Sequence, residues 1–521
     1  MTAKSRYDYL RSDRDQFLDT AREAARLTLP YLVTDDDSYR NGKKHLHKPW
    51  QSAGAKGVVT LASKLMLALL PVQTSFFKLQ IDELKLMGMQ GVDATVKSEL
   101  DLSFSKIERT MMEAISASDD RVVIHQAMKH LVVAGNALVY MGKDKLKLYP
   151  LNRYVVDRDG NGNVIEIVTK EVINRNVLNE SMPAGMQIPE PAPNRPGDDG
   201  EKGVGADDVD VYTHCKRDNN RYTWYQEVDG KMIPKSFGKA PLNTTPWLCL
   251  RFNVVDGEAY GRGRAEEFIG DLKSLEALSQ AMVEGSAAAA KVIFTVSPSS
   301  TTKPQTLASA GNGAIVQGRP EDIGVIQVGK TADFSTVMQM IQSFERRLGE
   351  AFLVLNVRDS ERTTAEEVRM TQMELEKQLG GLFSLLTVDF LVPYLNRKLD
   401  VAQKSKTIPK IPMDLVNPTI VAGVNAIGRG QDQESLNAFI QTITQSMGPE
   451  SIQKYISPEE FIKRLAAAQG IDTLNLVKTT DEVQQADQVQ QQQAEQMAMT
   501  QQAGKFAEVD QKAAAAEQAQ Q

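Results

Sequence analysis

Cysteine and histidine are scarce in this chain. Its 521 residues include 2 cysteines and 5 histidines. Cys215 and Cys249 cannot form a disulfide framework, and no Cys or His spacing matches a zinc site. Because structural disulfides are typical of oxidising compartments, the sequence favours a reducing one. It also predicts no metal site and no cofactor.

A membrane span, a secretion signal and an excess of positive charge are missing as well. The most apolar run, Leu65 to Val72, is too short to cross a bilayer. Residues 1–8 contain no apolar segment of the kind found in a signal peptide. We therefore predict a soluble intracellular protein with no membrane contact. With a formal net charge of −7, any contact with nucleic acid must be made by a few local basic residues.

Catalytic signatures are not apparent either. No nucleophile elbow, Ser-His-Asp pattern or paired-carboxylate motif stands out in the sequence. His214 and Cys215 are neighbours in a predicted strand, so their side chains should point to opposite faces and cannot act as a pair. The sequence therefore predicts no catalytic residue and a protein that is not an enzyme.

One nucleotide-binding motif is nevertheless present. Residues 324–331, GVIQVGKT, fit the P-loop pattern, and a predicted helix follows them. A phosphate cradle needs a strand before the first glycine and an open turn within the motif. The inner residues here favour extended backbone instead. We interpret the segment as a strand that ends at Gly329 and predict no nucleotide site, with a P-loop ATPase using Lys330 as the alternative.

The hydrophobic pattern changes near residue 262. Before it, short helices and strands alternate, and a segment rich in Pro, Gly and Asp at 182–206 is predicted to be a flexible loop. After it, apolar residues at three- and four-residue steps predict two long helices packed lengthwise on each other. A β-rich insert separates them, and the fold class is mixed α+β with helices predominating.

A short charged loop follows the second long helix and precedes a third. The third helix opens with capping-box spacing at Thr363 and Glu366, and Gly380 with Gly381 predicts a kink inside it. The loop has nearly balanced charge and the helix after it is mildly acidic, so a lumen lined by that helix would repel phosphate on average and touch it only at isolated points, which suits sliding DNA. A solvated helix–helix turn is the alternative. The candidate DNA-facing residues are Arg358, Asp359, Ser360, Glu361 and Arg362 in the loop, with Glu366 and Arg369 lining the channel beyond it.

Blocks in collinear order along almost the whole chain resemble the portal proteins, or head-to-tail connectors, of short-tailed, podovirus-type bacteriophages. The P-loop match does not belong to this family pattern, and residues 182–206 and the extreme tail match it poorly. The matching blocks are WQSAGAKG at 50–57, LASKLMLAL at 61–69, LVVAGN at 131–136, DVYTH at 210–214, YGR at 260–262, GDLKSLE at 270–276, GRPED at 318–322, TAEEVR at 364–369, LGG at 379–381 and AIGRGQD at 426–432.

The resemblance implies a portal-like architecture, assembled as a ring around a central channel. Its expected parts are a wing at 1–262, stem helix 1 at 263–293, a clip at 294–329, stem helix 2 at 330–355, a tunnel loop at 356–363, a long kinked wing helix at 364–400, a helical crown at 401–480 and a Gln/Ala-rich tail at 481–521.

The resemblance also implies a function and a set of partners. A ring of about twelve copies would occupy one capsid vertex of the virion and conduct double-stranded DNA during packaging and ejection. It would dock the terminase large subunit and a tail adaptor protein. With scaffolding protein and the major capsid protein it would nucleate the procapsid in the host bacterial cytoplasm. The expected docking residues are Lys303, Gln305, Arg319 and Glu321 in the clip. A structural capsid or adaptor protein without a DNA channel is the alternative.

Overall fold

The computed structural model describes most of the first 420 residues and one short helix beyond them. The described ranges are 2–34, 46–71, 75–81, 94–143, 145–180, 182, 187–188, 207–289, 293–299, 303–311, 315, 317, 319, 321, 323–326, 331–354, 381–409, 416–420, 438–446, 448 and 461. Contacts divide the chain into two units, Met1–Gly423 and Val424–Gln521. In the second unit, residues 438–446 are helical.

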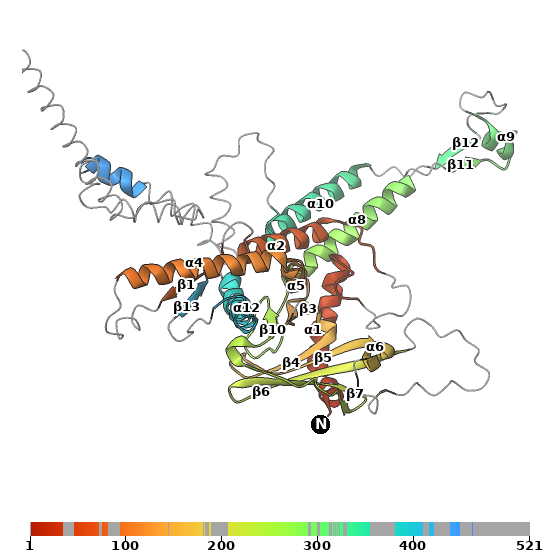
Figure 1. Cartoon of the computed structure of the whole chain (residues 1–521). Helices are drawn as coiled ribbons and strands as arrows, with labels where there is room; N and C mark the ends of the chain where they lie inside the picture. The colour runs from red at the N-terminus through yellow and green to blue at the C-terminus, as the bar shows by residue number, and fades with distance from the viewer. Residues whose placement is uncertain are drawn as a thin grey trace, which may run out of the picture. The chain divides into compact units, whose positions relative to one another are not determined.

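Four long helices, the short α6 (Arg175–Glu180) and two sheets make up most of the described N-terminal part of the first unit (Figure 1). Their positions match the predicted pattern closely, and the predicted fold class, mixed α+β, is confirmed. The long helices are α1 (Ala3–Leu27), α2 (Ala53–Leu69), α4 (Ala94–Ala117) and α5 (Asp120–Ala134). A 3-stranded sheet has the order β10-β2-β3, with β2 at Asn136–Met141, β3 at Leu146–Tyr149 and β10 at Trp247–Arg251.

The second sheet is 6-stranded and antiparallel. Its strands are β4 (Tyr154–Arg158), β5 (Val164–Asn174), β6 (Asp208–Asp218), β7 (Arg221–Val228), β8 (Lys231–Met232) and β9 (Gly238–Pro241). A tight turn joins β4 to β5, as its Asp-Gly-Asn-Gly sequence predicts. Gly162 takes a φ of +80°, and the Asp159 carboxylate accepts the backbone N–H of Asn161 at 3.0 Å and of Asn163 at 2.7 Å.

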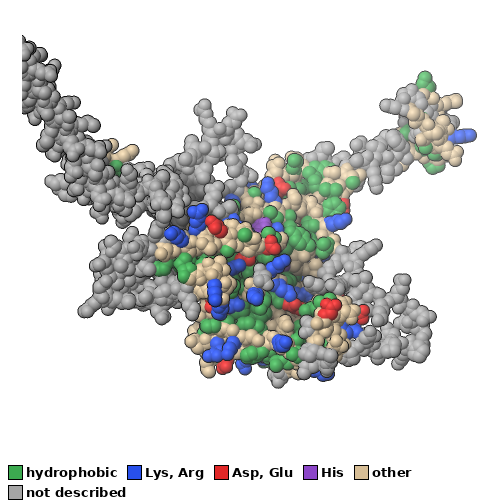
Figure 2. All heavy atoms as spheres, in the orientation of Figure 1, with side chains coloured by type: hydrophobic (Ala, Val, Ile, Leu, Met, Phe, Trp, Pro, Cys, Tyr) green, Lys and Arg blue, Asp and Glu red, His purple; other side chains and the backbone are tan. Residues whose placement is uncertain are grey.

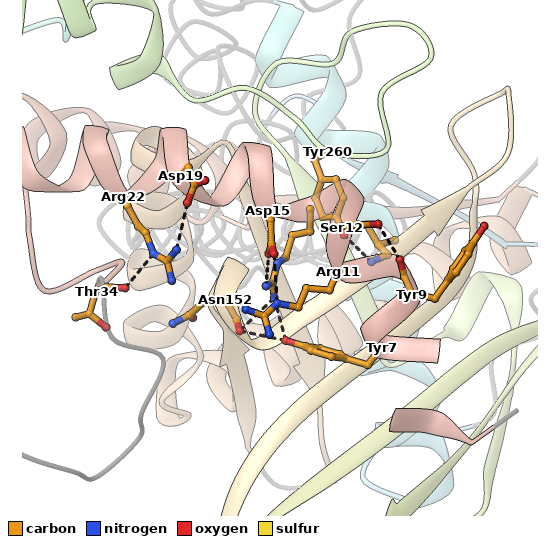
Figure 3. Close-up of polar contacts among 12 residues, drawn as sticks. Tyr7, Tyr9, Arg11, Ser12, Asp15, Asp19, Arg22, Thr34, Asn152 and Tyr260 are labelled. Carbon is orange, nitrogen blue, oxygen red and sulfur yellow. Dashed lines mark hydrogen bonds and ion pairs between the residues drawn. The ribbon is translucent and has the colours of Figure 1, made fainter. Parts of the chain in front are cut away.

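A buried arginine joins α1 to the start of this sheet. The Arg14 side chain is 1% exposed and donates to the Tyr7 hydroxyl at 2.9 Å and to the Asn152 carbonyl at 3.3 Å. Figure 3 shows Tyr7 and Asn152 converging on this point from α1 and from the turn before β4. The guanidinium also pairs with the Asp15 carboxylate at 2.7 Å, because a buried charge is tolerable only when it is paired and hydrogen-bonded. Tyr7 also packs on Val168 of β5, so α1 is attached to the sheet by both polar and apolar contacts.

His130 is an unusual member of α5, because it is buried without a proton acceptor for one ring nitrogen. It is 6% exposed, its Nδ1 has no hydrogen-bond partner, and burial lowers its pKa to about 4. In the unfolded chain the imidazole takes up a proton near pH 6.5, whereas in the folded protein it stays neutral down to about pH 4. Above pH 6.5 it is neutral in both states, so it does not change the free energy of unfolding there. Between pH 6.5 and 4 the free energy of unfolding should fall, by about 3 kcal/mol in all.

The replacement His130→Phe should therefore flatten the acid limb of a plot of melting temperature against pH. The melts are compared at one protein concentration. His47→Gln is the control, because that side chain is 37% exposed. Parallel curves for His130→Phe and the wild type between pH 6.5 and 4 would contradict the assignment.

Two long helices follow and pack lengthwise, as their periodicity predicts (Figure 1). The first is broken at Phe268 into α7 (Arg264–Glu267) and α8 (Ile269–Ala289), which corrects the prediction of one continuous helix. The second is α10 (Thr331–Ala351). Its predicted seam is confirmed, because Phe334, Val337, Ile341, Phe344 and Leu348 are buried or half-buried and the residues between them are exposed.

The pair is antiparallel. Arg347 near the end of α10 reaches Asp271 near the start of α8 at 3.2 Å, and Phe334 lies against Gly285 at the opposite end. In sequence, the segment that connects the two helices contains the antiparallel pair of β11 (Ile293–Val296) with β12 (Ile323–Ile326) and, between these strands, the helix α9 (Pro304–Ser309). The first residues of the P-loop match therefore lie in a paired strand, as predicted. Residues 327–330 are outside the described ranges.

The chain returns to the N-terminal part after residue 381. A short π-helix at Thr387–Leu391 leads into α12 (Val392–Lys404), and β13 (Val416–Ile420) pairs antiparallel with β1 (Phe77–Ile81). The predicted kink at Gly380 and Gly381 lies at the border of the described ranges and stays a prediction. The helical prediction for 401–480 is wrong for β13, because β1 offers a strand edge that local sequence does not reveal.

Candidate functional site

The predicted DNA-facing residues lie outside the described part of the chain. This applies to Arg358, Asp359, Ser360, Glu361, Arg362, Glu366 and Arg369. Both ends of the segment that carries them are described, at Val354 and at Gly381. The geometry of these two ends is the structural information that bears on the site.

The helix α10 ends in a Schellman motif with an unusual residue at its left-handed position. Leu353 has a φ of +56°, in the left-handed region that glycine usually occupies at this position. The backbone N–H of Val354 donates to the carbonyl of Gly349 at 2.7 Å, and that of Leu353 donates to Glu350 at 3.1 Å. These bonds satisfy carbonyls that the helix end would otherwise leave free. The stop is therefore sharply defined although it lacks a glycine.

An aromatic anchor fixes the same helix end to α2. Phe352 is 0% exposed, and its ring lies so close to α2 that a Cβ at Gly57 would stand 2.7 Å from it. The Phe268 ring, at the break between α7 and α8, is 6.3 Å from the Phe352 ring. A glycine at position 57 is thus required for this approach, because any side chain there would displace the anchor.

Two cations bind carbonyls at the end of α10 and just beyond it. The Lys64 ammonium group on α2 donates to the Leu353 carbonyl at 2.6 Å, and Arg264 Nε on α7 donates to the Ala351 carbonyl at 3.2 Å. Positive charge at a helix C-terminus is favourable, because the partial charge of the helix dipole there is negative. Burial lowers the pKa of Lys64. These residues were not among the predicted site residues, although a lysine within the apolar stretch of α2 is a signal that could have found Lys64.

The returning end of the segment lies beside the same arginine. Arg264 lines a cavity of about 440 Å³ together with Phe252, Gly381, Leu382 and Leu385. The Arg264 guanidinium also pairs with Glu267 at 2.7 Å and stacks on Phe268. The point where the chain leaves α10 and the point where it returns are therefore both in contact with Arg264 or its cavity.

The predicted docking residues are all on the surface. Lys303 and Gln305 lie at the start of α9, and Arg319 and Glu321 lie shortly before β12; all four are exposed. Figure 2 shows Lys and Arg side chains scattered over the visible face of the described residues, with Asp and Glu among them, rather than gathered in one basic patch. This distribution agrees with the expectation that contacts with nucleic acid are local.

His214 and Cys215, the neighbouring residues that could resemble a nucleophile–base pair, lie on opposite faces of the sheet. Cys215 points into the main core, where burial raises the pKa of its thiol. The His214 ring faces the other side, where it contacts the Tyr225 hydroxyl at 3.1 Å and Glu166 at 2.5 Å. The two side chains lie on opposite faces of β6, as predicted. In the ranges that the structure describes, no three His, Cys, Asp or Glu residues could hold a metal ion, and no helix could span a membrane.

Comparison with known families decides the relationship. The family model described as "Bacteriophage head to tail connecting protein" matches residues 1–477. The chain belongs to this connector family. Among its relatives are the portal protein of Escherichia phage T7, 37% identical over 490 residues, which covers 92% of this chain and 89% of the relative. The portal protein of Enterobacteria phage SP6 is 32% identical over 454 residues, covering 85% and 83% respectively.

Solved structures add little to this relationship. One of them, the neck of an empty GTA particle, covers 81% of this connector and 90% of its own chain, with 11% identity and a TM-score of 0.39. A likeness this weak supports no further statement. The connector's family membership therefore rests on sequence, and the geometry at the end of α10 is what the structure contributes to its site.

Proposed function

We propose that the connector assembles into a closed ring whose central channel carries double-stranded DNA during packaging and ejection. The family match over residues 1–477 carries this proposal. The antiparallel pair of α8 and α10 supports it, because long helices side by side suit the wall of a tube. A ring of about twelve copies follows the family expectation for closed cyclic assemblies.

We assign the parts of the chain to this ring as follows. Residues 1–262 and 364–400 form the wing, 263–293 and 330–355 the stem, and 294–329 the clip. Residues 356–363 form the tunnel loop, 401–480 the crown and 481–521 the tail. The antiparallel pair of β11 and β12, in the segment that connects the two long helices, supports the assignment of stem and clip. Within the range 401–480, Val416–Ile420 is the exception, because its pairing with β1 joins it to the wing.

The proposed partners follow from the same assignment. The exposed residues Lys303, Gln305, Arg319 and Glu321 are placed to dock the terminase large subunit and the tail adaptor protein. Scaffolding protein and the major capsid protein would join the ring in the host cytoplasm, before it takes its vertex in the virion. The connector itself would catalyse no reaction, and the pairing of Gly324 and Val325 in β12 disfavours a phosphate cradle there.

The tunnel-loop arginines provide the direct test. The double change Arg358→Ala and Arg362→Ala should leave ring assembly intact but alter the length of packaged DNA or its retention. Each arginine is expected to make one phosphate contact. The slope of log K for DNA binding against log salt concentration should therefore become shallower by about 2 for every subunit that contacts the DNA. Ring formation is measured by native mass, and packaging by the size and amount of encapsidated DNA.

The control for this test removes two exposed arginines from the N-terminal region. Arg109→Ala with Arg221→Ala changes the net charge equally, and both side chains lie on the surface. Packaging that is unchanged in the loop variant would mean that the loop is only a connection between helices. A protein that stays monomeric under all conditions, including with scaffolding protein, would contradict the ring itself.

A further inference from the structure

The end of α10 is held in a conformation that it would not adopt alone. Left-handed backbone is unfavourable for a residue with a Cβ, and it persists where surrounding contacts determine it. Leu353 takes this conformation while its side chain is only 5% exposed, so the turn is buried. The last described residue before the tunnel loop, Val354, follows it directly.

The polar contacts described for this turn from outside come from α2 and from the first residue of α7. Lys64 binds the Leu353 carbonyl, Arg264 binds the Ala351 carbonyl, and Gly57 makes room for Phe352. Of these contacts, the bond from Lys64 is the one made to the left-handed residue itself. It is also the shorter of the two cation contacts, 2.6 Å against 3.2 Å.

We propose that Lys64 is a positioning residue of the DNA channel: by binding the Leu353 carbonyl, its ammonium group fixes the direction in which the chain leaves α10 toward Arg358 and Arg362. The inference rests on the proposed function, because it gives a role to the loop as a DNA contact. Its structural half, that Lys64 holds the left-handed turn, stands on the described contacts alone.

The chemistry favours a cation at this place. The Leu353 carbonyl lies just beyond the last helical residue, Ala351, next to terminal carbonyls that carry the negative end of the α10 dipole. A partly buried ammonium group therefore gains both a charge-assisted hydrogen bond and a favourable field. Arginine can make the same bond through a different geometry, whereas methionine fills similar volume without charge or donor.

The experiment compares Lys64→Met and Lys64→Arg with the wild type, all as full-length protein. Lys56→Met is the matched control, because Lys56 lies on the same helix with its side chain exposed. Hydrogen exchange is followed at the amides of Phe352, Leu353 and Val354, and DNA retention is followed in packaged particles. Lys64→Met should speed exchange at these amides about tenfold. It should also lower DNA retention while native mass shows an intact ring, and Lys64→Arg should restore both readouts.

Wild-type exchange at these amides in Lys64→Met would overturn the inference, and so would faster exchange with wild-type DNA retention. If Lys64→Met does not assemble, Leu353→Gly replaces it. Glycine adopts the left-handed turn freely but also other conformations, so it should raise exchange and lower retention in the same way. An unaffected Leu353→Gly overturns the inference too. A wild-type protein that forms no ring would instead contradict the proposed function, while the exchange data would still decide what Lys64 holds.

Discussion

Replacing Gly135 with alanine should destabilise the connector by about 4 kcal/mol or more, which places it among the most damaging single changes in the chain. Gly135 ends α5 in the left-handed conformation, with a φ of +71°. A Cβ there would lie 2.5 Å from the Gly261 carbonyl oxygen and 2.6 Å from the Gly263 nitrogen. These neighbours are backbone atoms, so they cannot rotate away as a flexible side chain could.

The same change would break the hydrogen bonds beside it. Asn136 donates to the Gly261 carbonyl at 2.6 Å and accepts the Gly261 N–H at 2.7 Å, and both groups are buried. Denaturant unfolding of soluble protein, or its loss from the soluble fraction, measures the effect. Gly160→Ala is the control, since a Cβ there meets nothing within 4 Å. Equal stability of Gly135→Ala and Gly160→Ala would contradict the close approach.

The second large effect is expected for Asp120→Ala, at about 3–5 kcal/mol. The Asp120 carboxylate is 2% exposed and accepts from the Tyr394 hydroxyl at 2.6 Å and from Lys398 at 2.5 Å. These partners come from α12, so the carboxylate attaches the returning chain to α5. Its removal leaves a buried hydroxyl and an ammonium group without their acceptor, which costs more than the contact itself contributes.

The neighbouring Asp119 supplies a matched control for this prediction. Its side chain is exposed and makes no capping hydrogen bond, so Asp119→Ala should change the free energy of unfolding by less than about 0.5 kcal/mol. The double variant Asp120→Ala with Lys398→Met should recover part of the loss, because the orphaned charge is gone. A double variant no more stable than Asp120→Ala would show that Lys398 is hydrated and does not depend on the carboxylate.

Features set by neighbouring residues could be predicted from the sequence. The strand at 136–141 and the turn after Asp159 depend on alternation and on glycine placement, which are local signals. The spacing of the apolar residues in α10 likewise predicts which of its residues pack against α8. The family blocks at 131–136 and 260–262 meet in space at Gly135 and Gly261, which gives a physical reason for their shared pattern.

Features that need distant partners could not be predicted in this way. The break at Phe268 has no local signal in the sequence, and its ring lies 6.3 Å from that of Phe352, far away in the chain. The left-handed Leu353 has no local signal, because leucine rarely adopts that conformation and only its surroundings explain it. The strand at 416–420 needs the edge of β1, far away in the chain. The DNA-facing loop remains a prediction. Lys64 and Arg264, which bind the backbone just before the loop begins, could be identified only from the structure.

Because β1 pairs with β13, β1 cannot complete its sheet until nearly all of the first unit has been synthesised. Phe77 pairs with Ile420, so β1 leaves the ribosome long before its partner exists. At typical elongation rates the delay is on the order of tens of seconds, during which the edge of β1 is open to other chains. Nascent connectors on one messenger would then be at risk of pairing with one another through this edge. A chaperone that covers residues 77–81 during that interval would raise the yield of correctly closed subunits.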